Sequence, residues 1–452
     1  MGREREVASA GPALVRGLGP WASASIVVGT IIGTGIFLKT AVMAQVGGSA
    51  AWVLAAWAVA GALSLFGALT YAELGAMFPR AGGEYVFLRE GYGPGLGYLY
   101  AWNRFWIATP GSIAAYAVGT ATFLRVIVPD APTTYVAIAL VIVFTAFNCL
   151  EVRAGGWLQT VLTVMKIGMI SALAIGALFF ADGGDWARVT HRGAFPGASA
   201  FGAMVLSALW AYDGWNNLPM AAGEVRDPQK NLPRAIVWGS LGVVVIYALV
   251  NIGYFRALPF GEITAGGDIS VAQKTATTFL GGPAQALLAA AMAISAISAM
   301  NGSMLTGARV PYAVAADGLA PKQLAHVAAG ARVPTTAVLV QGGLAIGYAF
   351  AGSFDQLTDA VVFASWLFYA LNAGTVLLLR RREPDRERSF RVPGFPIVPV
   401  IFMALALLLL VNAVWTAPKP SALGLVVTAI GGIVYATMYR PSVNKPRGDD
   451  IP

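Results

Sequence analysis

The sequence predicts an all-α polytopic membrane protein with twelve transmembrane helices, ten of which form two oppositely oriented five-helix units. Three observations predict this fold class: an apolar composition, twelve apolar runs of spanning length, and two interrupted runs that lie five spans apart. Of the 452 residues, 57% are hydrophobic and only 12% are charged, whereas soluble domains carry about 25% charged residues. The mean hydropathy of +0.68 agrees with a chain that lies mostly in lipid.

Each predicted span is long enough to cross roughly 30 Å of hydrocarbon as a helix. The twelve ranges are 21–45, 51–77, 96–125, 133–150, 157–181, 200–222, 235–256, 283–313, 334–352, 357–379, 396–416 and 421–440. The first residues lack a short apolar run followed by a small-residue cleavage site, so we expect no secretory signal peptide.

Basic residues are distributed unevenly between alternate loops. With a cytoplasmic N-terminus, the inner loops and tails hold 21 of the 30 lysines and arginines, and the outer loops hold seven. This bias predicts that both termini are cytoplasmic, and it explains the net charge of +8 without a nucleic-acid partner. The segment "RRREPDRERSFR" (380–391) is predicted to be a solvated topological anchor, with binding of lipid headgroups as the alternative.

The first span contains "SIVVGTIIGTGIFLKT" (25–40), which is unusually rich in residues that weaken helices. One interpretation is close helix packing, because Gly29 and Gly33 form a GxxxG pair. The other is a break at Gly33-Thr34-Gly35 that frees backbone groups to hold a ligand. The second interpretation gains weight if a matching break occurs elsewhere.

The sixth span contains such an interruption, "LWAYDGWNN" (209–217), with Asp213 and Gly214 near mid-membrane. The first span runs outward and the sixth runs inward. Paired breaks in two oppositely oriented units predict an inverted-repeat secondary transporter. Half-helix ends offer N–H donors for a carboxylate and carbonyls for an ammonium, so the two breaks together predict a site for a zwitterion.

Asp213 and Trp210 each allow two interpretations. A carboxylate at the bilayer centre is costly, and Asp213 could cap the second half of the sixth span or provide a counter-charge for a substrate amine; these roles are compatible. Trp210, one turn before the break, could pack in the core or form a lid over the site.

Lys166 lies nine residues after Trp157, about 13 Å into the membrane, where it should find carbonyls or hydroxyls inside the bundle. It could be a fixed cation that ties the first span to the fifth, or a group that titrates because burial favours its neutral form. Arg104 could pair with Glu73. Supporting polar candidates in the eighth span, with small-residue packing as their alternative, are Ser298, Asn301 and Ser303.

Other chemistry is sparse in this sequence. Cys149 is the only cysteine, the two histidines fall in predicted loops, and no zinc, nucleotide or serine-hydrolase motif occurs. We therefore expect no enzyme activity, cofactor, metal site or internal disulfide. A channel or receptor-like membrane protein is the alternative outside transport, and saturable, trans-stimulated flux would argue against a channel.

Six stretches distributed over the chain resemble the amino acid–polyamine–organocation superfamily, and within it the L-type amino-acid transporter group. They are "GTIIGTGIF", "YAELGAMFPRAGGEYVFLREGYGP", "NCLEVRAGGWLQTVLTVMKI", "LWAYDGWNNLPMAAGEVRDPQKNLPRAI", "MNGSMLTGARVPYAVAADGLAP" and "FRVPGFPIVP". The resemblance implies a 5+5 inverted repeat, with broken helices one and six, plus two extra helices.

The resemblance also implies roles for residues at both breaks. Substrate carboxylate would contact the backbone of Ile31, Gly33, Thr34 and Gly35. Carbonyls facing the substrate amine would belong to Trp210, Ala211 and Asp213, with the Trp210 ring as a gate. Lys166 matches the lysine that replaces a sodium ion in related transporters.

Two departures limit the resemblance. The loop "VIVPDAP" lacks the cysteine that bonds animal relatives to a glycoprotein subunit, so no disulfide-linked heavy-chain subunit is expected. Asp213 stands where those relatives commonly have glycine, so side-chain specificity is not carried over.

These observations predict a transporter in the plasma (inner) membrane that exchanges small or medium neutral L-amino acids by alternating access. The alternatives are a proton-coupled amino-acid symporter, with Lys166 or Asp213 as the proton site, and a cationic amino-acid or polyamine carrier. The predicted parts are a tail (1–20), helices 1–5 (21–181), helices 6–10 (200–379), helices 11–12 (396–440) and a tail (441–452).

Overall fold

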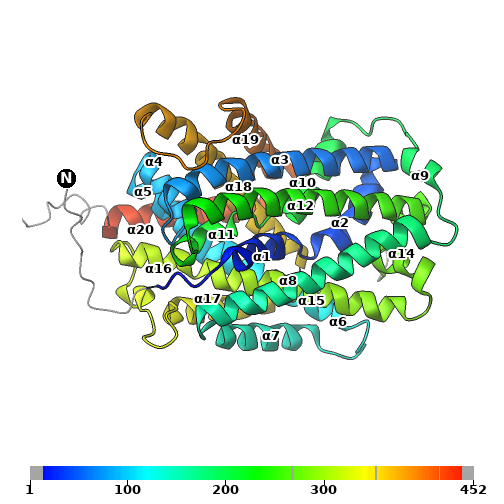
Figure 1. The fold of residues 1–452 in the computed structure, drawn as a ribbon, viewed down its shortest axis with the longest axis horizontal. Helices are drawn as coiled ribbons and strands as arrows, with labels where there is room; N and C mark the ends of the chain where they lie inside the picture. The colour runs from blue at the N-terminus through cyan, green and yellow to red at the C-terminus, as the bar shows by residue number, and fades with distance from the viewer. Residues whose placement is uncertain (1–13, 266–268, 352–353, 417, 440–452) are drawn as a thin grey trace, which may run out of the picture.

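The computed structural model describes residues 14–265, 269–351, 354–416 and 418–439. Most of the predicted N-terminal tail and all of the predicted C-terminal tail lie outside these residues. Within them, regular structure is helical apart from an isolated parallel bridge between Leu18 and Val225. Most helices run along the long axis of the molecule (Figure 1).

The helices lie at the predicted spans, with several additional short helices between them. The first part of the chain forms α1 (Pro20–Ile31), α2 (Gly35–Gly47), α3 (Ala50–Met77), α4 (Glu84–Tyr92), α5 (Pro94–Asn103), the π-helix η1 (Arg104–Ala108), α6 (Thr109–Leu124), α7 (Thr133–Asn148), α8 (Val152–Ile175) and the π-helix η2 (Gly176–Phe180).

The remainder begins after the loop that carries α9 (Trp186–Thr190). It forms α10 (Ala198–Tyr212), α11 (Asn217–Met220), η3 (Ala222–Glu224), α12 (Pro228–Ala257), α13 (Phe260–Thr264), α14 (Val271–Leu280), α15 (Ala284–Gly307), α16 (Arg309–Ala316), η4 (Lys322–Ala325), α17 (Thr335–Ala351), α18 (Phe354–Arg382), α19 (Ile397–Thr416), α20 (Pro418–Val434) and η5 (Tyr435–Tyr439).

Eight helical segments of the described chain are long and apolar enough to cross a membrane. They are Pro20–Gly47, Ala50–Met77, Pro94–Leu124, Val152–Phe180, Pro228–Ala257, Ala284–Ala316, Ile397–Trp415 and Ser421–Tyr439. Three shorter apolar helices accompany them, at Thr133–Asn148, Ala198–Tyr212 and Thr335–Phe350. The all-helical architecture is that of a polytopic membrane protein.

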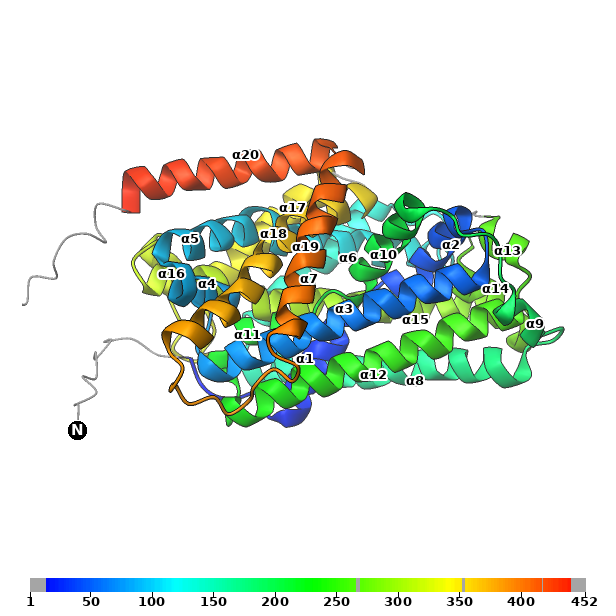
Figure 2. The same cartoon turned by 90° about the horizontal axis from the view of Figure 1, so that it is seen from above.

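The interrupted helices lie at the centre of the bundle. Helix α1 packs against α8, α12 and α15, and α10 packs against α2 and α3. The C-terminal helices are peripheral: α19 contacts α18 and α3, and α20 lies along one edge against α18 and α5 (Figure 2). A site formed by the breaks is therefore walled by protein on several sides, which is the condition for irregular backbone at membrane depth.

The expected pairing of Arg104 with Glu73 is wrong. Glu73 is fully buried, and its carboxylate accepts two hydrogen bonds of 2.8 Å from Arg380 and forms a 3.3 Å ion pair with Arg388. Arg104 instead donates to the side-chain oxygen of Asn217 at 2.7 Å. The carboxylate near the end of α3 thus contacts the last turn of α18, at Arg380, and the loop after it, at Arg388, and sequence spacing alone does not reveal this tertiary contact.

The same contacts correct the interpretation of segment 380–391 as a purely solvated anchor. Arg388 is 8% exposed, and Arg380 lies 4.5 Å from the centre of the Phe395 ring. Exposed residues such as Arg381 and Arg382 remain at the surface. Part of this basic cluster therefore neutralises a buried acid.

Candidate functional site

The two helix breaks meet in the structure. Helix α1 ends at Ile31 and α2 begins at Gly35, while α10 ends at Tyr212 and α11 begins at Asn217. The Thr30 hydroxyl donates to the Gly214 carbonyl at 2.9 Å. Gly214 has φ +127°, and a β-carbon there would lie 2.7 Å from the Thr30 carbonyl carbon. Only glycine combines this backbone conformation with so close an approach.

A tyrosine from α12 joins the same two segments. The Tyr247 hydroxyl lies 3.1 Å from the carbonyl oxygens of both Ile31 and Ala211. Gly35 faces Ala211 directly, with room for no side chain between them. The end of α1, the start of α2 and the end of α10 are thus held in contact by backbone and one phenol.

Beside this contact lies a pair of stacked aromatic rings. The Tyr116 and Trp210 rings are 6.3 Å apart with an interplanar angle of 29°, and a β-carbon at Gly33 would lie 3.0 Å from the Tyr116 ring. The Trp210 side chain is buried, at 7% exposure. Thr34 follows Gly33 in the chain, and its buried hydroxyl has no hydrogen-bond partner within the described residues.

Lys166 reaches the carbonyl groups that the first break leaves unpaired. Its ammonium lies 2.8 Å from the Gly29 oxygen, 2.5 Å from the Ile32 oxygen and 3.0 Å from the Ser295 oxygen. The Ser295 hydroxyl contacts the Ile32 and Gly33 oxygens at 3.1 Å. Unpaired carbonyls at a helix end are costly away from water, and α8 and α15 supply their donors here.

Two of the three polar candidates of α15, Ser298 and Asn301, contact Gln159 of α8. Gln159 donates to the Ser25 carbonyl and to the Ser298 hydroxyl, both at 3.3 Å. Asn301 donates to the Gln159 side-chain oxygen at 2.9 Å and accepts from Asn148 at 2.9 Å. Ser303 is buried farther along α15, at 3% exposure. Of the three candidates, Ser298 and Asn301 are thus joined in one network.

Asp213 does not cap α11, contrary to the first interpretation. The N-cap residue of that helix is Asn216, and Asp213 ends α10 with an extended backbone. Its side chain instead accepts a hydrogen bond of 2.7 Å from the hydroxyl of Tyr369 on α18. The carboxylate thereby connects the second break to a helix far along the chain.

Residues of this region that sequence reasoning missed include Gln159, Ser295, Tyr116, Tyr247 and Tyr369. Ser295 lies one turn before Ser298, so the same helical periodicity could have found it. The tyrosines carried no recognisable signal, because each belongs to an uninterrupted apolar helix where aromatic residues are ordinary packing groups.

The arrangement offers opposite partial charges at one place. The first N–H groups of α2 have no partner within that helix, and the last carbonyls of α10 likewise lack helical donors. The dipoles make the start of α2 electropositive and the end of α10 electronegative. Contact between Gly35 and Ala211 brings these two ends together, so the junction can hold neighbouring anionic and cationic groups.

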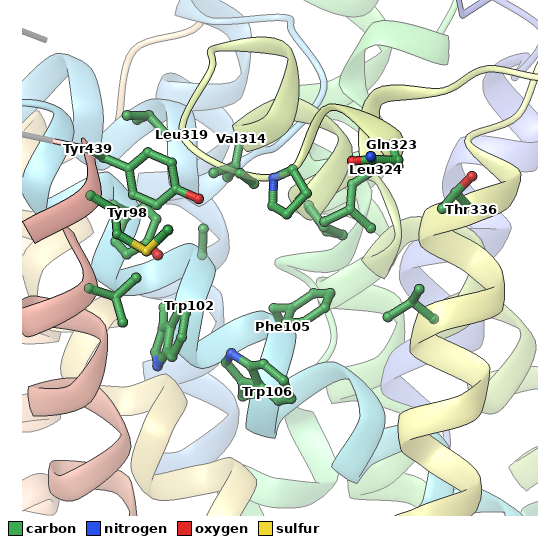
Figure 3. A pocket seen from close by; sticks show the side chains of 17 residues that line it. Tyr98, Trp102, Phe105, Trp106, Val314, Leu319, Gln323, Leu324, Thr336 and Tyr439 are labelled. Atoms are coloured by element: carbon green, nitrogen blue, oxygen red, sulfur yellow. The ribbon is translucent and has the colours of Figure 1, made fainter. Parts of the chain in front are cut away.

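A separate cavity lies away from the two breaks and has different chemistry. A cavity of about 600 Å³ is bounded by α5, η1, α16, η4, α17 and the end of the α20–η5 segment. The side chains of Trp102, Phe105 and Trp106 line one side, and Val314, Leu319 and Leu324 line another (Figure 3). This lining suits apolar molecules, because the charges of a zwitterion would lose their water without gaining partners.

The helical bundle with two interrupted, contacting helices is the architecture of a membrane transporter. Amino acid permeases match this chain over residues 18–437, and the protein belongs to that family. The chain is 32% identical to the mouse b(0,+)-type amino acid transporter 1 over 422 residues, which are 92% of this chain and 86% of the relative.

Two further relatives are named as exchangers or transporters of particular amino acids. The serine/threonine exchanger SteT of Bacillus subtilis (strain 168) is 29% identical over 420 residues, covering 92% of this chain and 95% of the relative. The human cystine/glutamate transporter is 29% identical over 421 residues, covering 91% and 83%. The chain is thus a multi-pass membrane protein whose relatives carry amino acids.

Proposed function

We propose that this permease exchanges small or medium neutral L-amino acids across the plasma membrane by alternating access. The observation that carries the proposal is the contact between the two breaks, at Gly35 and Ala211. It supports a single site that receives both charged ends of an amino acid. The names of the relatives support an exchange reaction and amino-acid substrates.

In this proposal the substrate carboxylate binds the electropositive start of α2, through backbone groups of Ile31, Gly33, Thr34 and Gly35. The ammonium binds the electronegative end of α10, through carbonyls of Trp210, Ala211 and Asp213. The unpaired Thr34 hydroxyl next to Gly35 supports the carboxylate position. Trp210, stacked on Tyr116, would close over the bound substrate as a gate.

Lys166 would be a permanent cation in this proposal. Three carbonyl oxygens within 3.0 Å favour its charged form; they belong to α1, to the irregular segment after it and to α15. Lys166 would hold the broken first span against the fifth span, while the network of Ser298 and Asn301, with Ser303 beyond it, supports the same wall.

The proposed topology has twelve spans, with both termini cytoplasmic. Helices 1–5 and 6–10 would form the two inverted repeats over 21–181 and 200–379, and helices 11 and 12 over 396–440 would be additional. The two interrupted helices, five spans apart, support this division. The loop 126–132 lacks a cysteine, which supports a transporter without a disulfide-linked heavy chain.

The test uses the purified full-length protein in proteoliposomes, screened against the twenty common amino acids. Liposomes loaded with an amino acid should take up labelled L-serine, L-threonine or another neutral amino acid much faster than empty liposomes. Uptake that saturates and requires internal substrate supports exchange.

Other results of the proteoliposome test would indicate a different function. Uptake into empty liposomes driven by an inward proton gradient would identify a symporter. Transport of L-lysine or putrescine in place of neutral amino acids would identify a cationic carrier, for which the Asp213 carboxylate at the second break is the supporting observation. Flux that neither saturates nor responds to internal substrate would indicate a channel.

A further inference from the structure

Glu84, the first residue of α4, is a buried acid that forms no ion pair within the described chain. Its exposure is 0%. The other two fully buried glutamates each have arginine partners: Glu73 meets Arg380 and Arg388, and Glu224 meets Arg309. Isolated buried carboxylates are costly when ionised. Of the three fully buried glutamates in the described chain, Glu84 is therefore the one without a cationic partner.

The hydrogen-bond partners of Glu84 include two neutral carboxamides, and the phenols of Tyr71 and Tyr100 also face its carboxyl group. Asn216, in the second helix break, donates to one carboxyl oxygen at 2.8 Å, and Asn372 of α18 lies 3.3 Å from the other. The side-chain oxygens of both asparagines are buried without a hydrogen-bond partner in the described residues. A protonated carboxyl would supply a donor, because either carboxamide can turn its oxygen toward it.

The ionisable groups near Glu84 are one cation, one other acid and three phenols. The cation is Arg104 and the acid is Asp213; the phenols belong to Tyr71, Tyr100 and Tyr369. Arg104 donates to Asn217, and Asp213 accepts from Tyr369. One guanidinium balances one carboxylate. A second ionised carboxylate would leave a net charge of −1 around the break, and one proton removes it.

We propose that Glu84 is a proton-binding site beneath the second helix break, and that its protonated form is the one that allows the transporter to close over substrate. Closure removes water from the break, and the cost of dehydration rises with an uncompensated charge. A zwitterionic amino acid adds no net charge, so it leaves this balance unchanged. The flux part of the inference rests on the proposed exchange function.

The electrostatic surroundings agree with this assignment. Burial raises the pKa of Glu84 to about 7, because Arg104 and the hydrogen bonds from Asn216 and Tyr71 lower this pKa less than burial raises it. At equal pH on both sides, exchange of L-serine should therefore fall as pH rises through about 7. From one pH unit below that value to one unit above, the protonated fraction falls roughly tenfold, and the exchange rate should follow it.

The decisive variant is Glu84→Gln, which keeps the shape and removes the titration. Infrared difference spectra of the purified full-length protein should contain a carboxylic-acid C=O band that disappears as pH rises through about 7 in the wild type. The band should be missing from Glu84→Gln, and L-serine exchange by this variant should lose its pH dependence over the same interval. Glu262→Gln, at an exposed site, is the matched control and should behave as wild type.

The infrared band tests whether Glu84 binds a proton, and the exchange measurement tests the proposed function, so the two can fail separately. A band that persists in Glu84→Gln but vanishes in Asp213→Asn would overturn the inference, as would a wild type without such a band. A band assigned to Glu84 in a protein that exchanges no amino acid would leave the proton site standing and reject exchange.

A second variant guards against a Glu84→Gln protein that does not fold. Removing the nearby positive charge by Arg104→Gln should shift the midpoint of the wild-type band to higher pH, because the ionised carboxylate loses electrostatic support. An unchanged midpoint in Arg104→Gln would contradict the assignment.

Discussion

A β-carbon added to Gly35 would stand 2.5 Å from the β-carbon of Ala211 and 2.6 Å from its α-carbon. The first residue of α2 and the next-to-last residue of α10 therefore touch through backbone and a single methyl group. This contact brings the electropositive start of α2 to the electronegative end of α10. It predicts that a larger side chain at position 35 will disturb the junction.

Replacing Gly35 with leucine should abolish exchange while the protein still inserts and purifies as a folded species. The side chain would occupy the junction and force α2 and α10 apart, at a cost of about 1–3 kcal/mol. Exchange in proteoliposomes and elution from a sizing column measure the two effects. Gly168→Leu in α8 is the matched control, because a β-carbon there has no neighbour within 4 Å. Normal apparent affinity in Gly35→Leu would place the site elsewhere.

The stacking of Trp210 on Tyr116 predicts that smaller side chains at position 210 will close the substrate site less well. Trp210→Ala should raise the apparent KM for the exchanged amino acid about two- to tenfold, since an aromatic pair contributes about 0.5–1.5 kcal/mol. Trp210→Phe keeps a ring over Tyr116 and should recover most of the affinity. Concentration-dependent exchange measures both. Equal kinetics for the wild type and the alanine variant would reduce Trp210 to a packing residue.

Removal of Lys166 should impair both transport and stability. Lys166→Ala removes the ammonium donor from the Gly29 and Ile32 carbonyls. Ile32 keeps the Ser295 hydroxyl as a donor, whereas the Gly29 carbonyl loses its side-chain donor, and a buried group without a partner costs about 1–3 kcal/mol. We expect a lower melting temperature in detergent and greatly reduced exchange. An inward proton gradient should not drive accumulation of substrate by the wild type, because Lys166 keeps its charge throughout the cycle.

One result would reverse the interpretation of Lys166. If an inward proton gradient drives concentrative uptake in the wild type, and Lys166→Ala loses that uptake but retains counterflow, then Lys166 is the coupling group of a symporter.

The pair of Glu224 and Arg309 predicts a stability effect distinct from transport. Two hydrogen bonds, of 2.7 and 2.9 Å, join these fully buried side chains. Arg309→Met should lower the free energy of unfolding by about 3–5 kcal/mol because it leaves a buried carboxylate unpaired, and the double variant with Glu224→Met should recover much of the loss. Thermal unfolding in detergent measures the cycle.

An exposed ion pair provides the comparison for that cycle. Arg80 and Glu90 lie 2.8 Å apart at the surface, with the Arg80 side chain 56% exposed, and Arg80→Met should change stability by about 0–1 kcal/mol. Additive losses for Glu224→Met and Arg309→Met, with no recovery in the double variant, would contradict the buried pair's predicted coupling.

The helices and their interruptions could be predicted because they depend on local sequence. Glycines at 33, 35 and 214 weaken helices wherever they occur, and long apolar runs need lipid. The structure moves the first break by one residue, since Gly35 already begins α2 and Ile32 joins the irregular segment.

Pairings between distant segments could not be predicted in the same way. Glu73 and Arg104 are both buried ions in neighbouring spans, yet Glu73 meets residues more than 300 positions away. Glu84 falls between the predicted spans 51–77 and 96–125, and nothing in its immediate sequence indicates that Asn216 and Asn372 will surround it. Such contacts depend on how whole helices pack.

The short bridge between Leu18 and Val225 has a mechanical consequence. Leu18 donates to the Glu224 carbonyl and accepts from the Arg226 amide, both at 2.9 Å. The chain just before α1 and the chain just after η3 are therefore clasped at the end of the molecule where the described N-terminal segment lies (Figure 1). If α1 moves away from the bundle at this end, it must carry the segment after α11 with it or first break these two hydrogen bonds. The two interrupted helices are therefore mechanically coupled at this point.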